Sequence, residues 1–247
     1  MTTMYTMLGC AIALWMISIK LKNASIADLI WGMWFVIQAG IAYLEFPTNR
    51  SLLMLTLTTI WGVRLSIYLG WRNHGQPEDR RYQAMRSNHG SHFWWRSLFT
   101  VFLFQMLIAW IVGSPQRYAT TEAPFTILDT IGVVFFCIGL FFEVVGDWQL
   151  SRFLKQGNRD GVLNTGLWKY TRHPNYFGDA LLWWGLGLIG FSATGTWWVL
   201  ISPLLMTGLL LKVSGVAMLE KTIGIRRPKY QDYVNRTSAF IPWFPRQ

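Results

Sequence analysis

The chain has 247 residues, of which 52% are hydrophobic and only 14% are charged. Soluble domains contain roughly 25% charged residues, so this composition excludes an ordinary soluble enzyme and predicts an integral membrane protein. The net charge of +10 would suit a nucleic-acid partner, but the distribution of the charges along the chain explains it better. We therefore expect no nucleic-acid partner.

Seven apolar stretches have the length that a helix needs to cross a bilayer. The predicted fold is all-α, a polytopic bundle of seven transmembrane helices, with residues 1–247 in a single membrane domain. The first stretch lacks a charged n-region and a clear cleavage site, so we expect it to be retained as a span. The predicted spans are Met4–Ile19, Ile26–Leu44, Leu52–Trp71, Phe93–Gly113, Phe125–Val145, Tyr176–Ser192 and Thr196–Leu219.

The basic residues fall mainly on one side of this predicted bundle. Eighteen of the 22 Lys and Arg residues follow the first, third, fifth and seventh spans, whereas the other side carries Arg50 and Arg117. Cytoplasmic loops carry the excess of positive charge in membrane proteins. The N-terminus should therefore be outside and the C-terminus cytoplasmic. The protein would be an integral, multi-pass membrane protein, in the inner membrane if its source is bacterial.

The two cysteines, Cys10 and Cys137, both fall inside apolar runs. Thiols in such surroundings are typical of packing residues rather than of a disulfide framework or a metal site. We therefore predict no metal site from the sequence.

Titratable and polar residues mark the second and third predicted spans. Ser25 could cap the second span and Asp28 would then lie in its first turn, where the helix dipole favours an acid. Asp28 could equally be a functional acid at the cytoplasmic mouth of the bundle. Arg64 lies about two turns inside the third span, so it should face a partner or a cavity. Tyr68 follows one turn later on the same face.

The polar loop from Arg72 to Ser91 is longer than a bare connection needs, and long loops are often functional. Its mixed charges would also suit a solvated cytoplasmic loop. The fifth span ends in Glu143 and Asp147, four residues apart, before the bases Arg152 and Lys155. This pattern predicts a helix that carries an acid and two bases to the cytoplasmic face.

The run from Tyr170 to Asp179 differs from the rest of the chain, because it places two phenols, two basic or titratable groups, an amide and a carboxylate in ten residues. Pro174 suits the first turn of a helix, where its missing N–H costs nothing. Arg172 and His173 should then lie at the mouth of a helix that enters the membrane.

Two residues of this run, Asn175 and Asp179, lie four positions apart and should share one helix face. A carboxylate one turn inside a span is costly in hydrocarbon, so Asp179 should face the protein interior or a wet cavity. A plain helix start with anchoring charges would explain Arg172 and His173, but not the amide and the acid beneath them.

The sixth predicted span contains the sequence GLGLIG from Gly185 to Gly190. A GxGxxG motif binds a dinucleotide only between a strand and a helix N-terminus, where free N–H groups meet the pyrophosphate. These glycines lie in mid-span, so we predict that they allow close helix packing instead.

The C-terminal tail combines basic and aromatic residues. Its basic residues could bind anionic lipid headgroups. Tyr230 and Tyr233 lie among them, and an aromatic cluster closes the chain. The interleaved aromatic residues favour a folded lid over a loose basic tail.

The predicted topology brings many basic side chains to one membrane face, and the guanidinium fork of arginine suits phosphate oxygens. A buried amide and carboxylate suit hydroxyls or an amide group. NADPH offers both kinds of group, whereas S-adenosylmethionine is smaller, cationic and without phosphate. The predicted converging residues are Arg64, Arg72, Arg152, Lys155, Arg172, His173 and Arg227.

The segment from Tyr170 to Asp179, together with the length and hydropathy of the chain, resembles the membrane family of steroid 5-alpha-reductases and its bacterial members of unassigned function, the DUF1295 type. In that family a motif N-(F/Y)-x-G-(D/E) supplies an amide and an acid to the cofactor, here Asn175 and Asp179. Isoprenylcysteine and phospholipid methyltransferases share a related RHPxYxG motif, although their acid usually lies further on. The resemblance covers most of the chain from Ile60 onward, so the cofactor-binding half would be residues 60–247.

The resemblance also implies which residues bind NADPH. The segment from Asp147 to Lys155 is similar to the family's acid-plus-basic segment, and Arg64, Arg72 and Asn73 are similar to positions that bind phosphate and ribose. The full implied set is Arg64, Arg72, Asn73, Asp147, Arg152, Lys155, Tyr170, Arg172, His173, Asn175, Tyr176, Asp179, Arg227 and Tyr233.

The activity implied by the resemblance is hydride transfer from NADPH to an enone, with a protein acid at the carbonyl oxygen. The animal enzymes hold that carbonyl with a glutamate in the second helix and a tyrosine in the third. Here Trp61 occupies the tyrosine position, and Asp28 is the best acid. We take Asp28 and Tyr68 as the candidate catalytic residues, with Tyr82 as a second substitute for the tyrosine.

Three functions therefore stay open at the level of the sequence. The first is an NADPH-dependent reductase of a steroid-like or other lipid substrate that enters from the bilayer. The second is an S-adenosylmethionine-dependent methyltransferase of a lipid or prenylated substrate. The third is a lipid-binding membrane protein without enzymatic activity. Membrane lipids are expected partners in each case, and the oligomeric state is left open.

Overall fold

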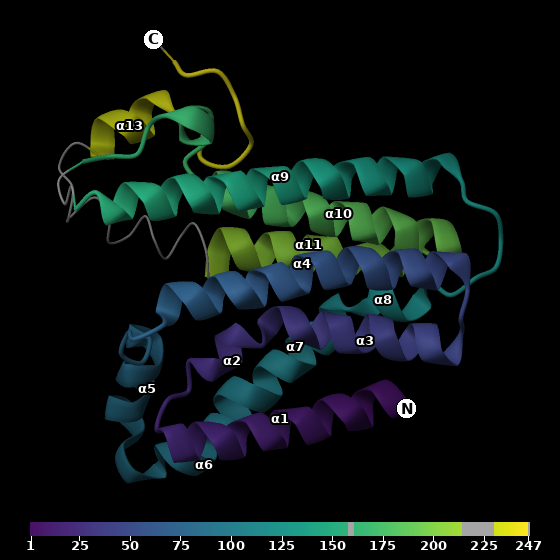
Figure 1. The fold of residues 1–247 in the computed structure, drawn as a ribbon, viewed down its shortest axis with the longest axis horizontal. Helices are drawn as coiled ribbons and strands as arrows, with labels where there is room; N and C mark the ends of the chain where they lie inside the picture. Colours follow the sequence, from purple (N-terminus) through teal and green to yellow (C-terminus); the bar gives the residue numbers. More distant parts are fainter. Residues whose placement is uncertain (158–160, 214–229, 247) are drawn as a thin grey trace. The chain divides into compact units, whose positions relative to one another are not determined.

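The computed structural model describes residues 1–157, 161–213 and 230–246, and every regular element within them is a helix (Figure 1). The all-α prediction is therefore confirmed for this part of the chain. Two compact units are present. The first comprises Met1–Pro124 with Ala193–Gly195, and the second comprises Phe125–Ser192 with Thr196–Gln247.

The first unit is built from eight α-helices, with a 3₁₀ turn at Gly90–His92 and a π-helical stretch at Leu98–Leu103. Two of its helices, α3 and α4, pack closely because Gly32 and Gly62 face each other. A Cβ atom on Gly32 would lie 2.5 Å from the carbonyl oxygen of Gly62. The helices are α1 (Thr2–Leu21), α2 (Ile26–Leu29), α3 (Trp31–Glu45), α4 (Asn49–Asn73), α5 (Arg80–His89), α6 (Phe93–Ser97), α7 (Phe104–Val112) and α8 (Ser114–Tyr118).

The start of the second predicted span differs from the prediction in two ways. The expected single helix is divided into α2 and α3, which meet at Ile30. Ser25 occupies the N-cap of α2 but makes no capping hydrogen bond, so that prediction was wrong. The physical reason is a competing partner, because the Ser25 hydroxyl accepts the backbone N–H of Asp79 at 2.7 Å.

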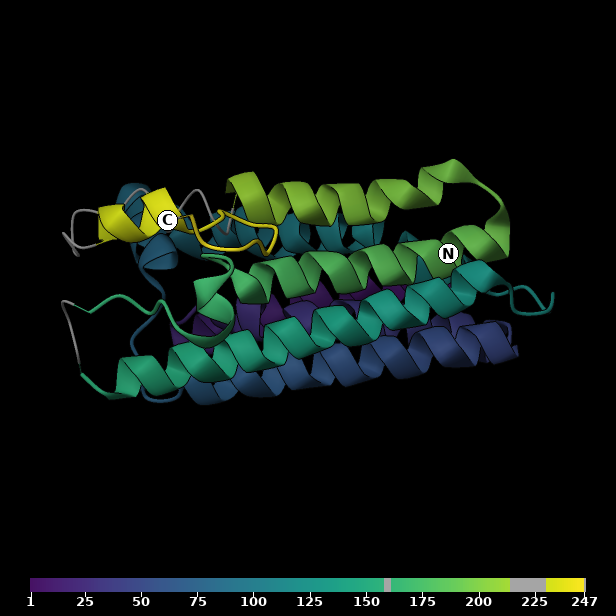
Figure 2. The ribbon, with the colours of Figure 1, turned by 90° about the horizontal axis from the view of Figure 1, so that it is seen from above.

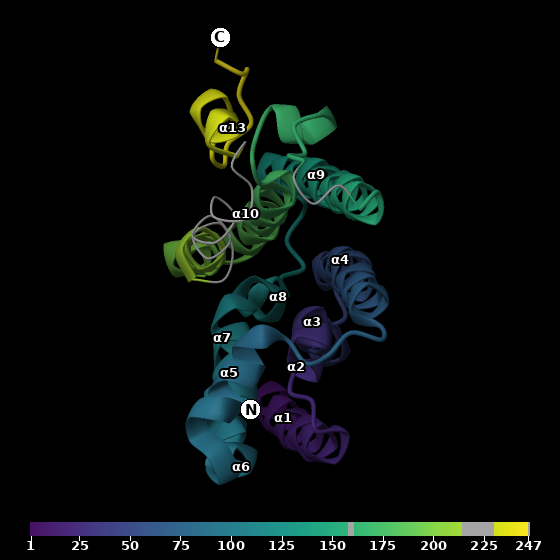
Figure 3. The ribbon, with the colours of Figure 1, turned by 90° about the vertical axis from the view of Figure 1, so that its left-hand side faces the viewer.

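The second unit contains α9 and α10 side by side, with α11 and the C-terminal elements around them (Figures 2 and 3). Its α9 begins with a capping box in which Thr126 and Asp129 exchange hydrogen bonds with backbone N–H groups. The elements are α9 (Ile127–Lys155), a 3₁₀ turn (Gly166–Lys169), α10 (Pro174–Thr194), a 3₁₀ turn (Trp197–Leu200), α11 (Ile201–Gly208), a π-helical stretch (Leu209–Val213) and α13 (Tyr230–Arg236).

Helices α9 and α10 run antiparallel and contact each other through glycines seven residues apart. A Cβ atom on Gly178 would lie 2.4 Å from the carbonyl oxygen of Gly139, and one on Gly185 would lie 2.4 Å from that of Gly132. Small residues allow helix backbones to approach closely in a membrane. The packing role predicted for the mid-span glycines is therefore confirmed at Gly185.

Four helical stretches are long and apolar enough to cross a membrane, among the residues that the structure describes. They support the prediction of a membrane protein. The number of seven spans and the orientation of the termini remain predictions, and the seventh predicted span extends past Val213, the last described residue before position 230. The four stretches are Thr2–Leu21, Asn49–Asn73, Arg80–Val112 and Ile127–Lys155.

Candidate active site

The polar motif lies at the beginning of α10, which starts at Pro174 as its sequence predicts. The three residues before it, Thr171, Arg172 and His173, are buried. The imidazole of His173 stacks on the ring of Tyr176, with 5.7 Å between the ring centroids and an interplanar angle of 16°. The motif is therefore packed into the second unit rather than exposed as a set of anchoring charges.

One polar pair joins α9 to α10 at the motif. The Nδ2 group of Asn175 donates to Oδ1 of Asp147 at 3.0 Å, and Asp147 is only 5% exposed. Gly146 makes this contact possible, because a Cβ atom there would lie 3.0 Å from the backbone nitrogen of Asn175. The Oδ1 atom of Asn175 is buried and accepts no hydrogen bond from any described residue. An amide oxygen in this position can accept an N–H or O–H group from a ligand.

Two further acids lie one helical turn away from this pair. Glu143 precedes Asp147 by one turn on α9 and is 4% exposed. Asp179 follows Asn175 by one turn on α10, and its Oδ1 atom is buried. The glycine contact between Gly139 and Gly178 keeps the two backbones close at this level. The helix pair thus places three carboxyl groups and an amide in its apolar interior, as the spacing of Asn175 and Asp179 predicts.

Arg172 contacts the C-terminal segment. Its guanidinium donates to the carbonyl oxygens of Val234 and Thr237 at 3.0 and 3.2 Å, and the residue is 8% exposed. Its backbone N–H donates to the carbonyl of Ser238 at 2.9 Å. Arg172 therefore fixes the tail against the motif, and its contact with a cofactor phosphate remains a prediction.

Among the other predicted cofactor residues of the second unit, Tyr170 accepts the backbone N–H of Trp243 at its carbonyl oxygen, 2.9 Å away. Tyr233 donates its hydroxyl proton to the carbonyl of Trp168, so it belongs to the same C-terminal contact as Arg172. Arg152 and Lys155 lie exposed in the last turn of α9. Arg227 lies outside the described residues.

In the first unit, the predicted residues of the third span share one face of α4. The guanidinium carbons of Arg64 and Arg72 lie 5.3 and 5.8 Å from the ring centroid of Tyr68. The Nε group of Arg72 donates to the Asn73 side chain at 3.1 Å. This stacking follows from the four-residue spacing of Arg64, Tyr68 and Arg72.

Asp28 has partners that are distant in the sequence. Its Oδ1 atom accepts the hydroxyl of Tyr82 at 2.6 Å, and its Oδ2 atom accepts Arg81 at 2.6 Å. The Nε2 group of Gln105 donates to Asp28 at 3.2 Å and to the Tyr82 hydroxyl at 3.1 Å. Tyr82 is 4% exposed, so the structure brings together an acid and a buried phenol. The sequence offered Tyr82 only as a substitute, since 54 positions separate it from Asp28.

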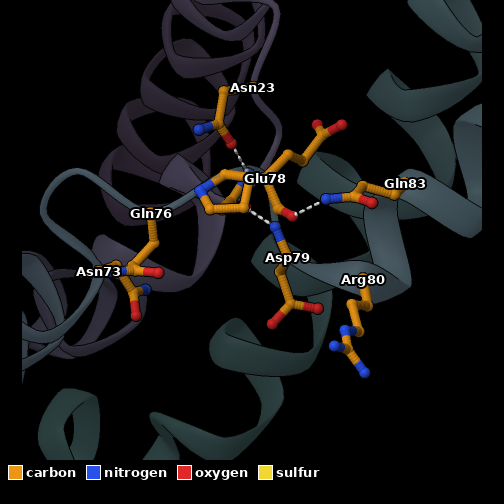
Figure 4. A pocket seen from close by; sticks show the side chains of 9 residues that line it. Asn23, Asn73, Gln76, Glu78, Asp79, Arg80 and Gln83 are labelled. Carbon is orange, nitrogen blue, oxygen red and sulfur yellow. Dashed lines mark hydrogen bonds between the residues drawn. The ribbon is translucent and has the colours of Figure 1, made fainter.

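The loop before α5 is ordered and forms a cavity of about 530 Å³ (Figure 4). Burial alone would raise the pKa of Glu78, but hydrogen bonds from Arg86 and from the backbone of Ala24 hold that pKa below its ordinary value. Burial would likewise raise the pKa of Asp79, but hydrogen bonds from the side chain and the backbone of Arg81 hold that pKa below its ordinary value. The cavity is lined by Asn23, Ser25, Asn73, Gln76, Pro77, Glu78, Asp79, Arg80 and Gln83.

A protein-family model described as "Protein of unknown function (DUF1295)" matches residues 14–237. The chain belongs to this family. An uncharacterized protein of Schizosaccharomyces pombe is 25% identical over 266 aligned residues, which cover 93% of this chain and 75% of the yeast protein. The family predicted from the motif is thereby confirmed.

Two plant enzymes share a shorter stretch with this chain. The steroid 5-alpha-reductase DET2 of Solanum lycopersicum is 30% identical over 99 residues, 39% of this chain and 38% of the plant enzyme. DET2 of Arabidopsis thaliana is 39% identical over 67 residues, 26% of this chain and 25% of the enzyme. The matches thus span well under half of each plant enzyme. No solved structure matches the chain.

Proposed function

We propose that this protein is an NADPH-dependent oxidoreductase that acts on CH–CH groups. It would reduce a carbon–carbon double bond conjugated to a carbonyl in a steroid-like or other lipid substrate, the reaction type of a 3-oxo-5-alpha-steroid 4-dehydrogenase. The family membership and the partial similarity to two steroid 5-alpha-reductases support an oxidoreductase. The substrate and the cofactor are the parts that we infer.

The observation that carries the proposal is the open acceptor on Asn175. Its amide nitrogen is committed to Asp147, while its buried Oδ1 atom has no described partner. A buried acceptor without a partner is costly, so a ligand that supplies an N–H or O–H there would be stabilised. NADPH carries such donors in its carboxamide and ribose groups, and the residues present therefore fit this cofactor.

The remaining cofactor contacts are assigned by charge. Arg152 and Lys155 extend from the last turn of α9, one to two turns beyond Asp147, and are exposed enough to bind phosphate oxygens. Asp179 and Asp147 would accept hydrogen bonds from hydroxyl or amide groups of the same ligand. NADPH, when bound, supplies the hydride.

The first unit supplies the candidate proton donor. The Tyr82 hydroxyl donates to Asp28 and accepts from Gln105, which fixes its orientation in a buried setting. The Tyr82 hydroxyl has a single proton, which Asp28 accepts here, so this O–H would turn from Asp28 to a carbonyl oxygen of the substrate and stabilise the enolate that forms there. Arg81 forms an ion pair with Asp28, with 2.6 Å between Nη2 and Oδ2. We assign the donor role to Tyr82 and the supporting role to Asp28, in place of Tyr68.

The test is cofactor titration into the purified protein in lipid nanodiscs, followed by turnover with a 3-oxo-4-ene steroid. We expect NADPH to bind, and Asn175→Ala to weaken that binding at least tenfold, about 1.4 kcal/mol. Asn164→Ala is the matched control, because Asn164 is an exposed asparagine of the same unit. Binding of S-adenosylmethionine in place of NADPH would overturn the proposal and favour a methyltransferase.

A further inference from the structure

The last described residues of the chain, 237–246, form a segment without helix that is tied to the residues just before α10. Because the ties involve backbone groups at both ends of the segment, its position relative to the start of α10 is fixed. The ties are the hydrogen bonds from Arg172 N to Ser238 O (2.9 Å), from Thr171 Oγ1 to Phe240 O (2.8 Å) and from Trp243 N to Tyr170 O (2.9 Å).

This fixed segment presents large apolar side chains outward. Ile241 is 65% exposed, Trp243 is 71% exposed and Phe244 is 76% exposed. Single exposed hydrophobic residues are normal, but three within four positions on an ordered segment form a patch that marks a contact surface. Phe240, between the ties, instead packs its ring against Phe177. The segment therefore has one face toward the protein and one apolar face away from it.

Positive charge surrounds this apolar face. A cavity of about 340 Å³ lies next to it, lined by Arg172, Arg236 and Arg246 together with Trp243 and Phe244, and none of the described residues that line it is acidic. The backbone N–H of Arg246 donates to the carbonyl of Arg236 at 2.9 Å, which closes the segment into a loop around the cavity. Such a cavity suits a phosphate group attached to an apolar body.

The segment lies at the end of the second unit where α9 ends and α10 begins (Figure 2). Since α9 is long and apolar enough to span a bilayer, this end lies where a membrane surface would be. Tryptophan and basic residues concentrate at that boundary in membrane proteins. Aromatic side chains insert between headgroups there, while cations attract anionic lipids.

We propose that residues 237–246 are an interfacial anchor of the second unit. Ile241, Trp243 and Phe244 insert into the boundary between headgroups and acyl chains, and Arg236 and Arg246 bind the phosphate of an anionic phospholipid in the adjacent cavity. This role is independent of any reaction that the protein catalyses. It makes the contact between the tail and Arg172 sensitive to the composition of the surrounding leaflet.

The first test measures where the segment lies. An environment-sensitive fluorophore is attached at Trp243→Cys in a background without the native cysteines, Cys10→Ser and Cys137→Ser. In nanodiscs we expect blue-shifted emission and quenching by lipids that carry a quencher near the headgroup. Gln231→Cys is the control, because Gln231 is exposed on α13 and should report water. Ile241→Cys repeats the measurement if the first variant does not fold. Equal emission in water-like surroundings at positions 231, 241 and 243 would overturn the anchor.

The second test measures the lipid contact. Nanodiscs of phosphatidylcholine alone are compared with nanodiscs that contain phosphatidylglycerol, using the fluorophore at position 243. We expect the anionic lipid to increase the blue shift, and the double variant Arg236→Gln with Arg246→Gln to lose at least half of that increase. An identical response of the double variant and the parent would overturn the assignment of the phosphate to these arginines. Both readouts are spectroscopic, so neither depends on NADPH or on turnover.

Discussion

The polar cluster of the α9–α10 pair and the Asp28 cluster of the first unit are assembled in different ways. Asn175 and Asp179 share a helix face through their spacing, and Glu143 and Asp147 do the same on the partner helix. Asp28 instead meets Tyr82 and Gln105 across 54 and 77 positions. Groups placed by helical spacing can be predicted, whereas groups placed by loop folding need the structure. We propose ligand binding for the first cluster and proton donation for the second.

The largest effect should come from Asp179. We expect Asp179→Ala to abolish NADPH binding while the protein still inserts into the membrane, because the α9–α10 interior would lose an acceptor for the ligand. Calorimetric or fluorescence titration in nanodiscs measures the binding, and membrane fractionation checks insertion. Binding of unchanged affinity would remove Asp179 from the site and leave the helix pair without the role assigned here.

The second prediction separates the two clusters. Tyr82→Phe should leave NADPH binding within about twofold of the parent and lower the rate of enone reduction by about 10²–10⁴, the contribution typical of a positioned proton donor. Single-turnover kinetics in nanodiscs measure the rate. Tyr5→Phe serves as the control, because Tyr5 is 67% exposed in α1. A normal rate in Tyr82→Phe would return the candidate role to Tyr68.

A third change tests the packing beneath the binding cluster. Gly178→Ala places a Cβ atom 2.4 Å from the backbone oxygen of Gly139, so the helices must separate, at a cost of about 1–3 kcal/mol. We expect a lower melting temperature and weaker NADPH binding. Gly9→Ala is the matched control, since a Cβ atom there meets nothing within 4 Å. Equal melting temperatures for both variants would contradict the close contact.

The smallest effect concerns the acids beside α5. The pKa of Glu78 lies below its ordinary value of 4.5, so its stabilising contribution is present above that pH and is lost as the pH falls through the lowered pKa. Glu78→Gln should therefore reduce the melting temperature at pH 7 and make less difference as the pH falls below 4.5 toward the lowered pKa. Because solvent screens the interaction of Glu78 with Arg86, the change in the free energy of unfolding should stay within about 1 kcal/mol. A variant that melts with the parent at pH 7 would refute the contribution.

Some features of the fold and site followed from local sequence rules, and others did not. Pro174 begins α10 and Gly185 packs against a neighbouring helix, as proline geometry and mid-span glycine predict. The predicted N-cap at Ser25 does not form, because the Ser25 hydroxyl accepts the backbone N–H of Asp79 instead. The contacts of Arg172 with the carbonyls of the tail were missed from the sequence, while its contact with a phosphate stays a prediction. Each miss involves a partner far along the chain, which no local pattern encodes.

The two arginines predicted on the outer side, Arg50 and Arg117, also have partners that no local sequence pattern encodes. Arg50 is 1% exposed and donates to the carbonyl oxygens of Ala123 and Pro124, both at 3.0 Å. Arg117 donates to Gln38 and to the carbonyl of Trp110, and burial lowers its pKa to about 10. Both side chains are bound to their own unit, so a count of basic residues alone does not reveal that they serve the fold.

The glycines spaced seven residues apart on α9 and α10 have a mechanical consequence. If α10 slid along α9 by one helical turn, bulky neighbours such as Phe136 and Phe142 would replace a glycine at the crossing, and the backbones would be forced apart. The glycine contacts therefore oppose a slide of one turn in either direction. An opening that preserves these glycine contacts would move the two helices together as one rigid body, with Asp147 and Asn175 still facing each other.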